Sequence, residues 1–281
     1  MIFQKTNVWN QILSLAAYAD GRLHPCGTAF LVGKGGLALT ATHVLDQPFD
    51  RGIVDIDRIG PERFPVIAFQ VVNRGATPLQ WQVTSMNRCP SLSGEDDRPL
   101  DIAFLTLKPT GDPVPEIENH RRLFFQLNIA TPRVGMRVAA YGFSNIRIKH
   151  DQDNPLDDGL WQRFRRVDAT ITAIHFPMRD AACMPFPCFE VDAVFEPGMS
   201  GGPIFNERDQ VCGVISRGSE IGASWASILW PALITPIGEK TAYQLAREGI
   251  MGMHNLQCIQ IRHLAGNDFP TVYFNPDLEK E

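Results

Sequence analysis

Short apolar runs separated by turn residues dominate the middle of the chain. Runs rich in Val, Ile, Phe and Leu alternate with clusters of Gly, Pro, Asn and Asp. This spacing is typical of β-strands joined by short turns. The runs predict strands at Thr28–Val32, Leu37–Thr42, Val66–Val72, Leu79–Val83, Ile102–Leu107, Arg137–Tyr141, Arg165–Ile174, Phe189–Val191, Gly202–Phe205, Val211–Ser216 and Ser227–Trp230.

Helical periodicity is confined to the two ends of the chain. Val8, Ile12, Leu13 and Ala16 share one helical face and predict an N-terminal amphipathic helix, with a cleaved leader as the alternative. Near the other end, a second helix is predicted to start at Thr235 and Pro236. Its apolar face consists of Ile237, Ala242, Leu245 and Ile250.

Two polar stretches, Ser91–Pro99 and Lys149–Gly159, interrupt the strand pattern. The second contains four aspartates, as calcium loops do, but Pro155 interrupts it and its Gly and Glu are misplaced for an EF-hand. We therefore expect a solvated acidic loop there. Beyond Arg247, Cys258–His263 and Pro270–Phe274 are predicted to form a small appended hairpin.

Composition narrows the class of protein. With 281 residues, 44% of them hydrophobic, the chain can bury a core, and 23 Gly and 21 Pro favour a turn-rich β architecture. A net charge of −5 argues against a general nucleic-acid binder. No apolar run is long enough to span a bilayer. We expect no membrane and no nucleic-acid partner.

The six cysteines are too few for a disulfide scaffold in a chain of this length. Without a convincing leader they predict reduced thiols and a cytoplasmic protein. Cys183 and Cys188 are spaced unlike zinc-finger ligands, so ordinary buried thiols or a loop pair are expected. The histidines outside the motifs below show no metal-binding spacing. No metal is predicted.

Three motifs could carry chemistry. His43 lies in Thr-Ala-Thr-His-Val, Asp101 opens the apolar strand Asp-Ile-Ala-Phe-Leu, and Ser200 lies in Pro-Gly-Met-Ser-Gly-Gly-Pro. A serine hydroxyl becomes a nucleophile when an imidazole takes its proton, and a carboxylate holds that imidazole in the required tautomer. Glycines beside the serine allow backbone N–H groups to converge on an oxyanion. Gly198 and Ser200 are the candidate donors.

These motifs, in the order His, Asp, Ser, resemble those of trypsin-like (chymotrypsin-fold) serine peptidases, in particular bacterial HtrA-type protease domains. The resemblance runs from about Cys26 to about Pro236. It implies an all-β fold of two six-stranded antiparallel barrels that meet near residues 120–135. Residues 1–25 would then form the N-terminal helix and lead-in, 26–236 the peptidase domain, and 237–281 the C-terminal helix and tail.

The resemblance also implies residue roles. His43 would be the general base and acid, Asp101 its orienting carboxylate and Ser200 the nucleophile of an acyl-enzyme mechanism without a cofactor. Ser216, Arg217 and Gly218 would form the edge strand that pairs with a peptide. Val194 would be the floor of the primary specificity pocket, narrowed by Phe195. Because Val194 is uncharged, an apolar preference at P1, the residue before the scissile bond, is predicted.

The sequence departs from the family pattern at two places. Met199 occupies the position where the trypsin branch has the aspartate that pairs with a new N-terminus on activation. Val44 follows His43, so the disulfide that often brackets the histidine is missing. No PDZ-like domain of useful size follows the peptidase region. These departures fit an enzyme that folds directly or one whose oxyanion turn is ordered by a partner.

Two alternatives stay open. Gly198–Gly202 also fits the serine turn of an α/β-hydrolase, with Asp209 and either His254 or His263 as partners, but the alternating β and α units of that fold are missing. A catalytically silent peptidase fold could instead be a binding scaffold or a partner-activated regulatory component. We predict an endopeptidase acting on proteins or peptides. The N-terminal helix and residues 252–281 are the predicted docking sites for a regulatory partner.

Overall fold

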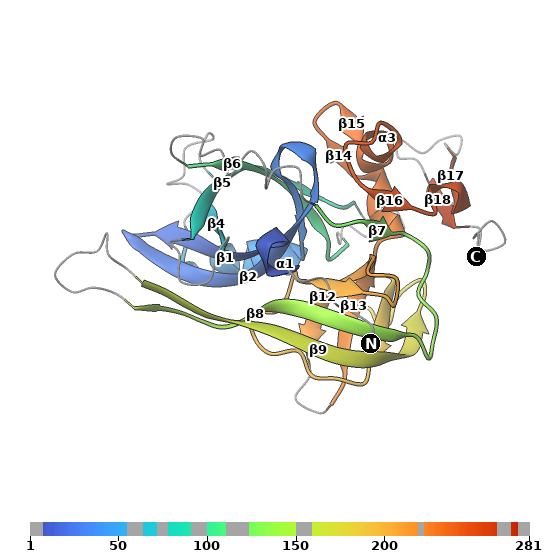
Figure 1. Cartoon of the computed structure of the whole chain (residues 1–281), viewed down its shortest axis with the longest axis horizontal. Helices are drawn as coiled ribbons and strands as arrows, with labels where there is room; N and C mark the ends of the chain where they lie inside the picture. Colours follow the sequence, from blue (N-terminus) through green and yellow to red (C-terminus); the bar gives the residue numbers. More distant parts are fainter. Residues whose placement is uncertain are drawn as a thin grey trace.

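The computed structural model describes residues 8–54, 64–71, 78–90, 100–110, 124–149, 159–218, 222–262 and 271–274. The polar stretch Ser91–Pro99 and most of the predicted acidic loop at Lys149–Gly159 lie outside these residues. Figure 1 shows two β-structures side by side, with the C-terminal elements packed above the second. No helix in the described part of the chain is long and apolar enough to cross a membrane.

The first structure is a closed six-stranded barrel in the order β1-β2-β3-β6-β5-β4. Every neighbouring pair in it is antiparallel. A single α-helix, α1 (Thr42–Asp50), leaves the end of β3. The strands are β1 (Ile12–Ala19), β2 (Arg22–Gly33), β3 (Leu37–Thr40), β4 (Val66–Gln70), β5 (Leu79–Arg88) and β6 (Ala103–Pro109), with 3-10 turns η1 (Val8–Gln11) and η2 (Lys34–Gly36).

The second barrel has the order β11-β8-β9-β10-β13-β12 and is closed by pairing of β11 with β12. Two short strands, β7 and β16, extend the β12 edge in parallel. The strands are β7 (Leu127–Asn128), β8 (Arg137–Lys149), β9 (Gly159–His175), β10 (Cys188–Val191), β11 (Pro203–Phe205), β12 (Val211–Gly218), β13 (Ser224–Ile228) and β16 (Met253–His254). The predicted all-β fold with two six-stranded antiparallel barrels is confirmed.

The predicted N-terminal helix is wrong, because Ile12–Ala19 is strand β1 of the first barrel. Its first six residues are all buried, so the run lacks the alternation that marks a half-exposed strand, and it contains good helix formers. The sequence does contain a pattern that argues for a strand here. Asp20 and Gly21 have φ angles of 51° and 75° and form a two-residue turn that pairs Ala19 with Arg22. Asp-Gly between apolar runs is a strong hairpin signal.

The predicted C-terminal helix is shorter than expected. Helix α3 spans Ala242–Arg247, and the preceding residue, Thr241, forms a capping box with Gln244 that satisfies the first turn. Pro236, the expected start, lies instead in a tight hairpin. The remaining elements are η5 (Trp230–Ile234), β14 (Pro236–Ile237), β15 (Lys240–Thr241), η6 (Leu256–Cys258), β17 (Ile259–Arg262) and β18 (Thr271–Phe274). Strands β17 and β18 pair, which confirms the appended hairpin.

Aromatic side chains fill the seam between the barrels. Phe125, in the connection between them, contacts Phe30 of the first barrel and Phe205 of the second, with ring centroids 6.2 Å and 4.9 Å away. Its backbone N–H also donates to Leu31 O at 2.9 Å. Tyr141 of β8 continues the cluster, edge-on to Phe205. This apolar contact fixes the barrels against each other and so places the residues at their interface.

Candidate active site between the two barrels

The first barrel contributes a histidine and an aspartate from neighbouring elements. His43 lies in the first turn of α1, directly after β3, and Asp101 precedes β6, the strand that pairs with β3. Thr42 Oγ1 donates to Leu100 O at 2.8 Å and ties the two segments together. The pairing of β3 with β6 therefore brings together two residues that are 58 positions apart.

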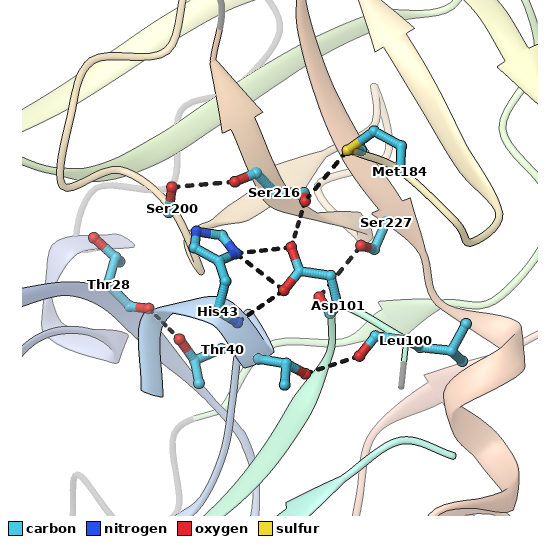
Figure 2. Close-up of polar contacts among 10 residues, drawn as sticks. Thr28, Thr40, His43, Leu100, Asp101, Met184, Ser200, Ser216 and Ser227 are labelled. Atoms are coloured by element: carbon cyan, nitrogen blue, oxygen red, sulfur yellow. Dashed lines mark hydrogen bonds and ion pairs between the residues drawn. The ribbon is translucent and has the colours of Figure 1, made fainter. Parts of the chain in front are cut away.

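The Asp101 carboxylate accepts hydrogen bonds from three donors, one of which is the imidazole of His43, as Figure 2 shows. His43 Nδ1 lies 3.0 Å from Oδ1 and 2.9 Å from Oδ2 of Asp101, and the backbone N–H of His43 donates to Oδ1 at 3.0 Å. The third donor is Ser216 Oγ of the second barrel, which hydrogen-bonds to Oδ2. With Nδ1 engaged, Nε2 is the imidazole nitrogen left to accept a proton from a neighbour.

These contacts shift both pKa values. Burial opposes the charged imidazolium, but the charge and hydrogen bonds of Asp101 outweigh it and raise the pKa of His43 above 6.5. Burial would raise the pKa of Asp101, yet the donors from His43 and Ser216 lower it below 3.8. The Asp101 carboxylate is thus charged at neutral pH. The His43 side chain is 45% exposed, so its imidazole remains accessible from the cleft.

Ser200 lies in the turn between β10 and β11, on the second barrel. Gly198 in this turn has a φ of +96° and Gly201 a φ of +83°, left-handed conformations that favour glycine. A side chain at Gly201 would collide with Thr28 O and Thr40 Oγ1 of the first barrel. Glycine here lets the serine turn lie against the other barrel, next to His43.

The hydroxyl of Ser200 donates to Ser216 O at 3.2 Å. No hydrogen bond joins it to His43 in the described structure, although both residues line one cleft of about 690 Å³. The N–H groups of Gly198 and Ser200 make no hydrogen bond within the described residues. They are thus available as donors at the serine turn.

Thr28 is a site residue that sequence analysis missed. Its N–H donates to Ser200 O at 2.8 Å and its Oγ1 donates to Gly198 O at 2.8 Å. The same Oγ1 accepts from the N–H of Phe143 in β8 at 3.0 Å. Thr28 thus anchors the serine turn to the first barrel. Only its place two residues after Cys26, in the run that leads into the barrel, could have drawn attention to it.

The predicted specificity residues are partly brought together. Val194 and Gly218 line the cleft, and Val194 is 44% exposed. Phe195 also borders the cleft, but its side chain is buried in the core. Its carbonyl oxygen packs so closely on Gly218 that any side chain at Gly218 would collide with it. The backbone of Phe195, rather than its ring, therefore lies against Gly218 at this part of the cleft.

Arg217 lies outside the large cleft. It borders a second hollow of about 200 Å³ that also contacts His43, Asp46, Asp50 and Ser216. The large cleft is also lined by residues that sequence analysis did not predict as site residues. Those residues are Pro25, Cys26, Gln47, Arg51, Asn145, Ile146, Glu196 and Pro197. Burial raises the pKa of Cys26 to about 12, so this thiol stays protonated and is no rival nucleophile.

Comparison with known proteins agrees with this architecture. The trypsin-like peptidase domain family matches residues 27–214, about two thirds of the chain. The chain belongs to the trypsin-like peptidase family. Membership implies protein or peptide substrates and confirms the family resemblance stated from the motifs. No curated protein matched the sequence.

Solved structures similar to this trypsin-like domain include two of the Rv3671c protease. The active form from M. tuberculosis shares 16% identity over 89% of this chain and 86% of that one, with a TM-score of 0.47. The inactive form shares 17% identity over 87% and 91% of the two chains, with a TM-score of 0.46. Deg5 shares 16% identity over 80% and 86%, with a TM-score of 0.47.

The role of Thr28 is testable with two substitutions. Thr28→Val removes the hydroxyl that holds Gly198 and leaves the Phe143 N–H without its acceptor, whereas Thr28→Ser keeps both bonds. If the serine turn works as a catalytic element, Thr28→Val should lower kcat about tenfold with a smaller change in KM, the equivalent of one hydrogen bond. Thr28→Ser should stay near wild type. Equal kcat values in both variants would contradict this positioning role.

Proposed function

We propose that the chain is a serine endopeptidase that uses Ser200 as nucleophile, His43 as general base and acid, and Asp101 as the residue that orients His43. The observation that supports this most directly is the Asp101-bound imidazole of His43, which shares a cleft with Ser200 at a glycine-rich turn. A family match alone would leave the chemistry open, because one fold can host active and silent members.

In this mechanism Ser200 Oγ attacks the carbonyl carbon of the scissile peptide bond while His43 Nε2 takes the hydroxyl proton. The tetrahedral oxyanion accepts hydrogen bonds from the N–H groups of Gly198 and Ser200. His43 then gives its proton to the leaving amine, which leaves an acyl-enzyme. Water, deprotonated by His43, then attacks this ester, and His43 returns the proton to Ser200 Oγ as the acid product leaves. Asp101 remains ionised and stabilises the imidazolium at each step.

The resting hydrogen bond of Ser200 fits this sequence of events. Ser216 O, its present acceptor, lies on the strand edge that we propose pairs with the substrate main chain. A substrate N–H that donates to Ser216 O would compete with the serine hydroxyl for this acceptor. Rotation of the Ser200 side chain toward His43 Nε2 would then form the reactive pair. Catalytic hydrogen bonds are often incomplete before substrate binds.

Labelling with a fluorophosphonate probe tests the proposed function. An activated Ser200 should react covalently in the wild type, and the label should disappear in Ser200→Ala and His43→Ala. Ser85→Ala, at an exposed position on β5, is the matched control and should label like the wild type. A wild type that stays unlabelled while correctly folded would favour the alternative, a binding scaffold.

The raised pKa of His43 predicts the acid side of the pH profile. Protonated His43 cannot accept the serine proton, so kcat/KM should rise with pH and reach half its maximum above pH 6.5. In the Ser200→Ala background, NMR titration should give a lower His43 pKa when Asp101 is also changed to Asn, since the carboxylate favours the charged ring. The NMR signal that disappears in a His43→Gln variant belongs to His43. An unchanged His43 pKa in the Asp101→Asn variant would contradict the coupling.

We further propose an apolar residue at P1. Val194 carries no charge, and the Glu196 carboxylate at the same cleft is already paired with Arg165. Peptide nitroanilides ending in Ala or Val should therefore be cleaved at least about tenfold faster than those ending in Arg, whose unpaired cation would be buried. Val194→Asp should raise the relative rate for Arg. Fastest cleavage after Arg in the wild type would overturn this preference.

The cellular setting is also a proposal. None of the six cysteines forms a disulfide, which supports a reducing compartment such as the cytoplasm. A regulatory partner cannot dock on an N-terminal helix, since that segment is β1, but the β17–β18 hairpin remains a proposed docking element. Removing Ile259–Glu281 keeps β16 in its sheet. If removal leaves the rate of probe labelling in cell extract unchanged, the docking proposal fails.

A further inference from the structure

Strands β8 and β9 continue beyond the second barrel as a two-stranded ribbon. Their pairing runs as far as Lys149 opposite Gly159, whereas β11 pairs with β8 only at Ala139 and Ala140. On the other side, β10 pairs with β9 only between Ile171 and His175. Figure 1 shows the ribbon projecting past this barrel and alongside the first one. The ribbon therefore extends one wall of the interface between the barrels.

One face of this ribbon covers the serine turn. Gly142 lies opposite Arg165, and a Cβ atom on Gly142 would point to within 2.9 Å of Met199 Cα. Arg165 forms an ion pair with Glu196, in the same turn. Side chains two apart on a strand share a face, so Arg163 and Trp161 follow Arg165 on this side.

Arg147 joins the same face. A bulge between Ser144 and Arg147 changes the register, so that Ser144 lies opposite Arg163 and Arg147 opposite Trp161. Directly opposed residues of an antiparallel pair project from the same side. We call Arg147, Trp161 and Arg163 the ribbon patch. It begins where Asn145 and Ile146, the residues of the bulge, line the cleft.

The ribbon patch is exposed, and the nearest described carboxylate, Glu196, is paired with Arg165 and interacts with Arg163 only through its charge. Trp161 is 67% exposed, and Arg147 and Arg163 are exposed and form no ion pair within the described residues. Arg165, by contrast, has its own carboxylate partner. Arg51, which is exposed and also forms no ion pair within the described residues, lines the cleft itself. Arg147 directly follows the cleft residues Asn145 and Ile146, in a chain whose net charge is −5.

A substrate bound as in the proposed function would reach this patch with its C-terminal half. A peptide antiparallel to Ser216–Gly218 places the residues before the scissile bond along that strand. The residues after the bond then leave in the other direction, between Pro25 and Cys26 on one wall and Asn145 and Ile146 on the other. An extended peptide advances about 3.3 Å per residue, so the ribbon is reached a few residues beyond the bond.

We propose that Arg51 and the ribbon patch select protein substrates that carry acidic side chains two to four residues after the scissile bond. This inference rests on the proposed function, because it takes Ser200 as the point of cleavage. Carboxylates there would pair with arginines that form no ion pair within the described residues, and guanidinium groups bind carboxylates with defined geometry. Trp161 would pack against the peptide between these contacts.

Two quenched fluorescent peptides test the proposal. They share one cleavable sequence and differ only in carrying Glu or Gln at the second to fourth positions after the bond. The wild type should cleave the Glu peptide about five- to tenfold faster in kcat/KM, as expected for two or three partly exposed ion pairs. In about 1 M salt, where the Debye length falls to about 3 Å, this ratio should approach one.

Charge reversal at the patch should invert the preference. In Arg147→Glu/Arg163→Glu the Gln peptide should be cleaved faster than the Glu peptide, whereas Arg208→Glu, at an exposed turn between β11 and β12, should keep the wild-type ratio. Equal rates for both peptides in a wild type that labels with fluorophosphonate would overturn the patch and leave the peptidase proposal intact. An unchanged ratio of the two cleavage rates in Arg147→Glu/Arg163→Glu would likewise overturn the patch and leave the peptidase proposal intact.

A binding measurement separates the two proposals. Ser200→Ala binds without cleaving, so fluorescence anisotropy with labelled Glu and Gln peptides tests the patch even if the wild type proves inactive. Tighter binding of the Glu peptide to this variant, lost on charge reversal of Arg147 and Arg163, supports the patch. Equal affinities would overturn it, whatever the labelling experiment shows about catalysis.

Discussion

The carboxylate of Asp101 is the constraint on which the site depends. It is 7% exposed and lies at the seam of the two barrels, where an unpaired charge would cost several kcal/mol. The first barrel supplies two of its donors through His43, and the second supplies Ser216 Oγ. All three hydrogen bonds to the carboxylate form only when the two barrels pack in this arrangement. The packing that stabilises the Asp101 carboxylate therefore also orients the imidazole of His43.

The same seam determines where the nucleophile can lie. Thr28 holds the serine turn from the first barrel through two hydrogen bonds, and Gly201 allows the turn to touch β2 and β3. Neither barrel alone would place Ser200 near His43. The Ser200 hydroxyl donates to Ser216 O and shares its cleft with the imidazole of His43. In the proposed mechanism, occupation of Ser216 O by a substrate main chain would link substrate binding to formation of the reactive pair.

Local patterns predicted much of this protein, and long-range packing explains what they missed. The strands and the three motifs depend on neighbouring residues, so the sequence indicated them directly. Strand β1 was assigned wrongly because burial on both faces removes the alternation of a strand. Thr28 lies 170 positions from Gly198, and Ser216 lies 115 from Asp101. Such contacts follow from how two barrels pack, which periodicity does not encode.

The chemistry of the cleft walls determines which part of the site would select the substrate. Main-chain pairing along Ser216–Gly218 would bind any extended peptide, and a narrow uncharged pocket distinguishes apolar residues only weakly. In our proposal, Arg51 and the arginines of the ribbon patch, which form no ion pair within the described part of the chain, supply the strongest remaining discrimination between substrates. The net charge of −5 does not cancel them, since charges more than about 8 Å apart are largely screened at physiological salt. An acidic peptide close to the ribbon is therefore attracted by the local arginines, while the distant negative surface of the protein contributes little.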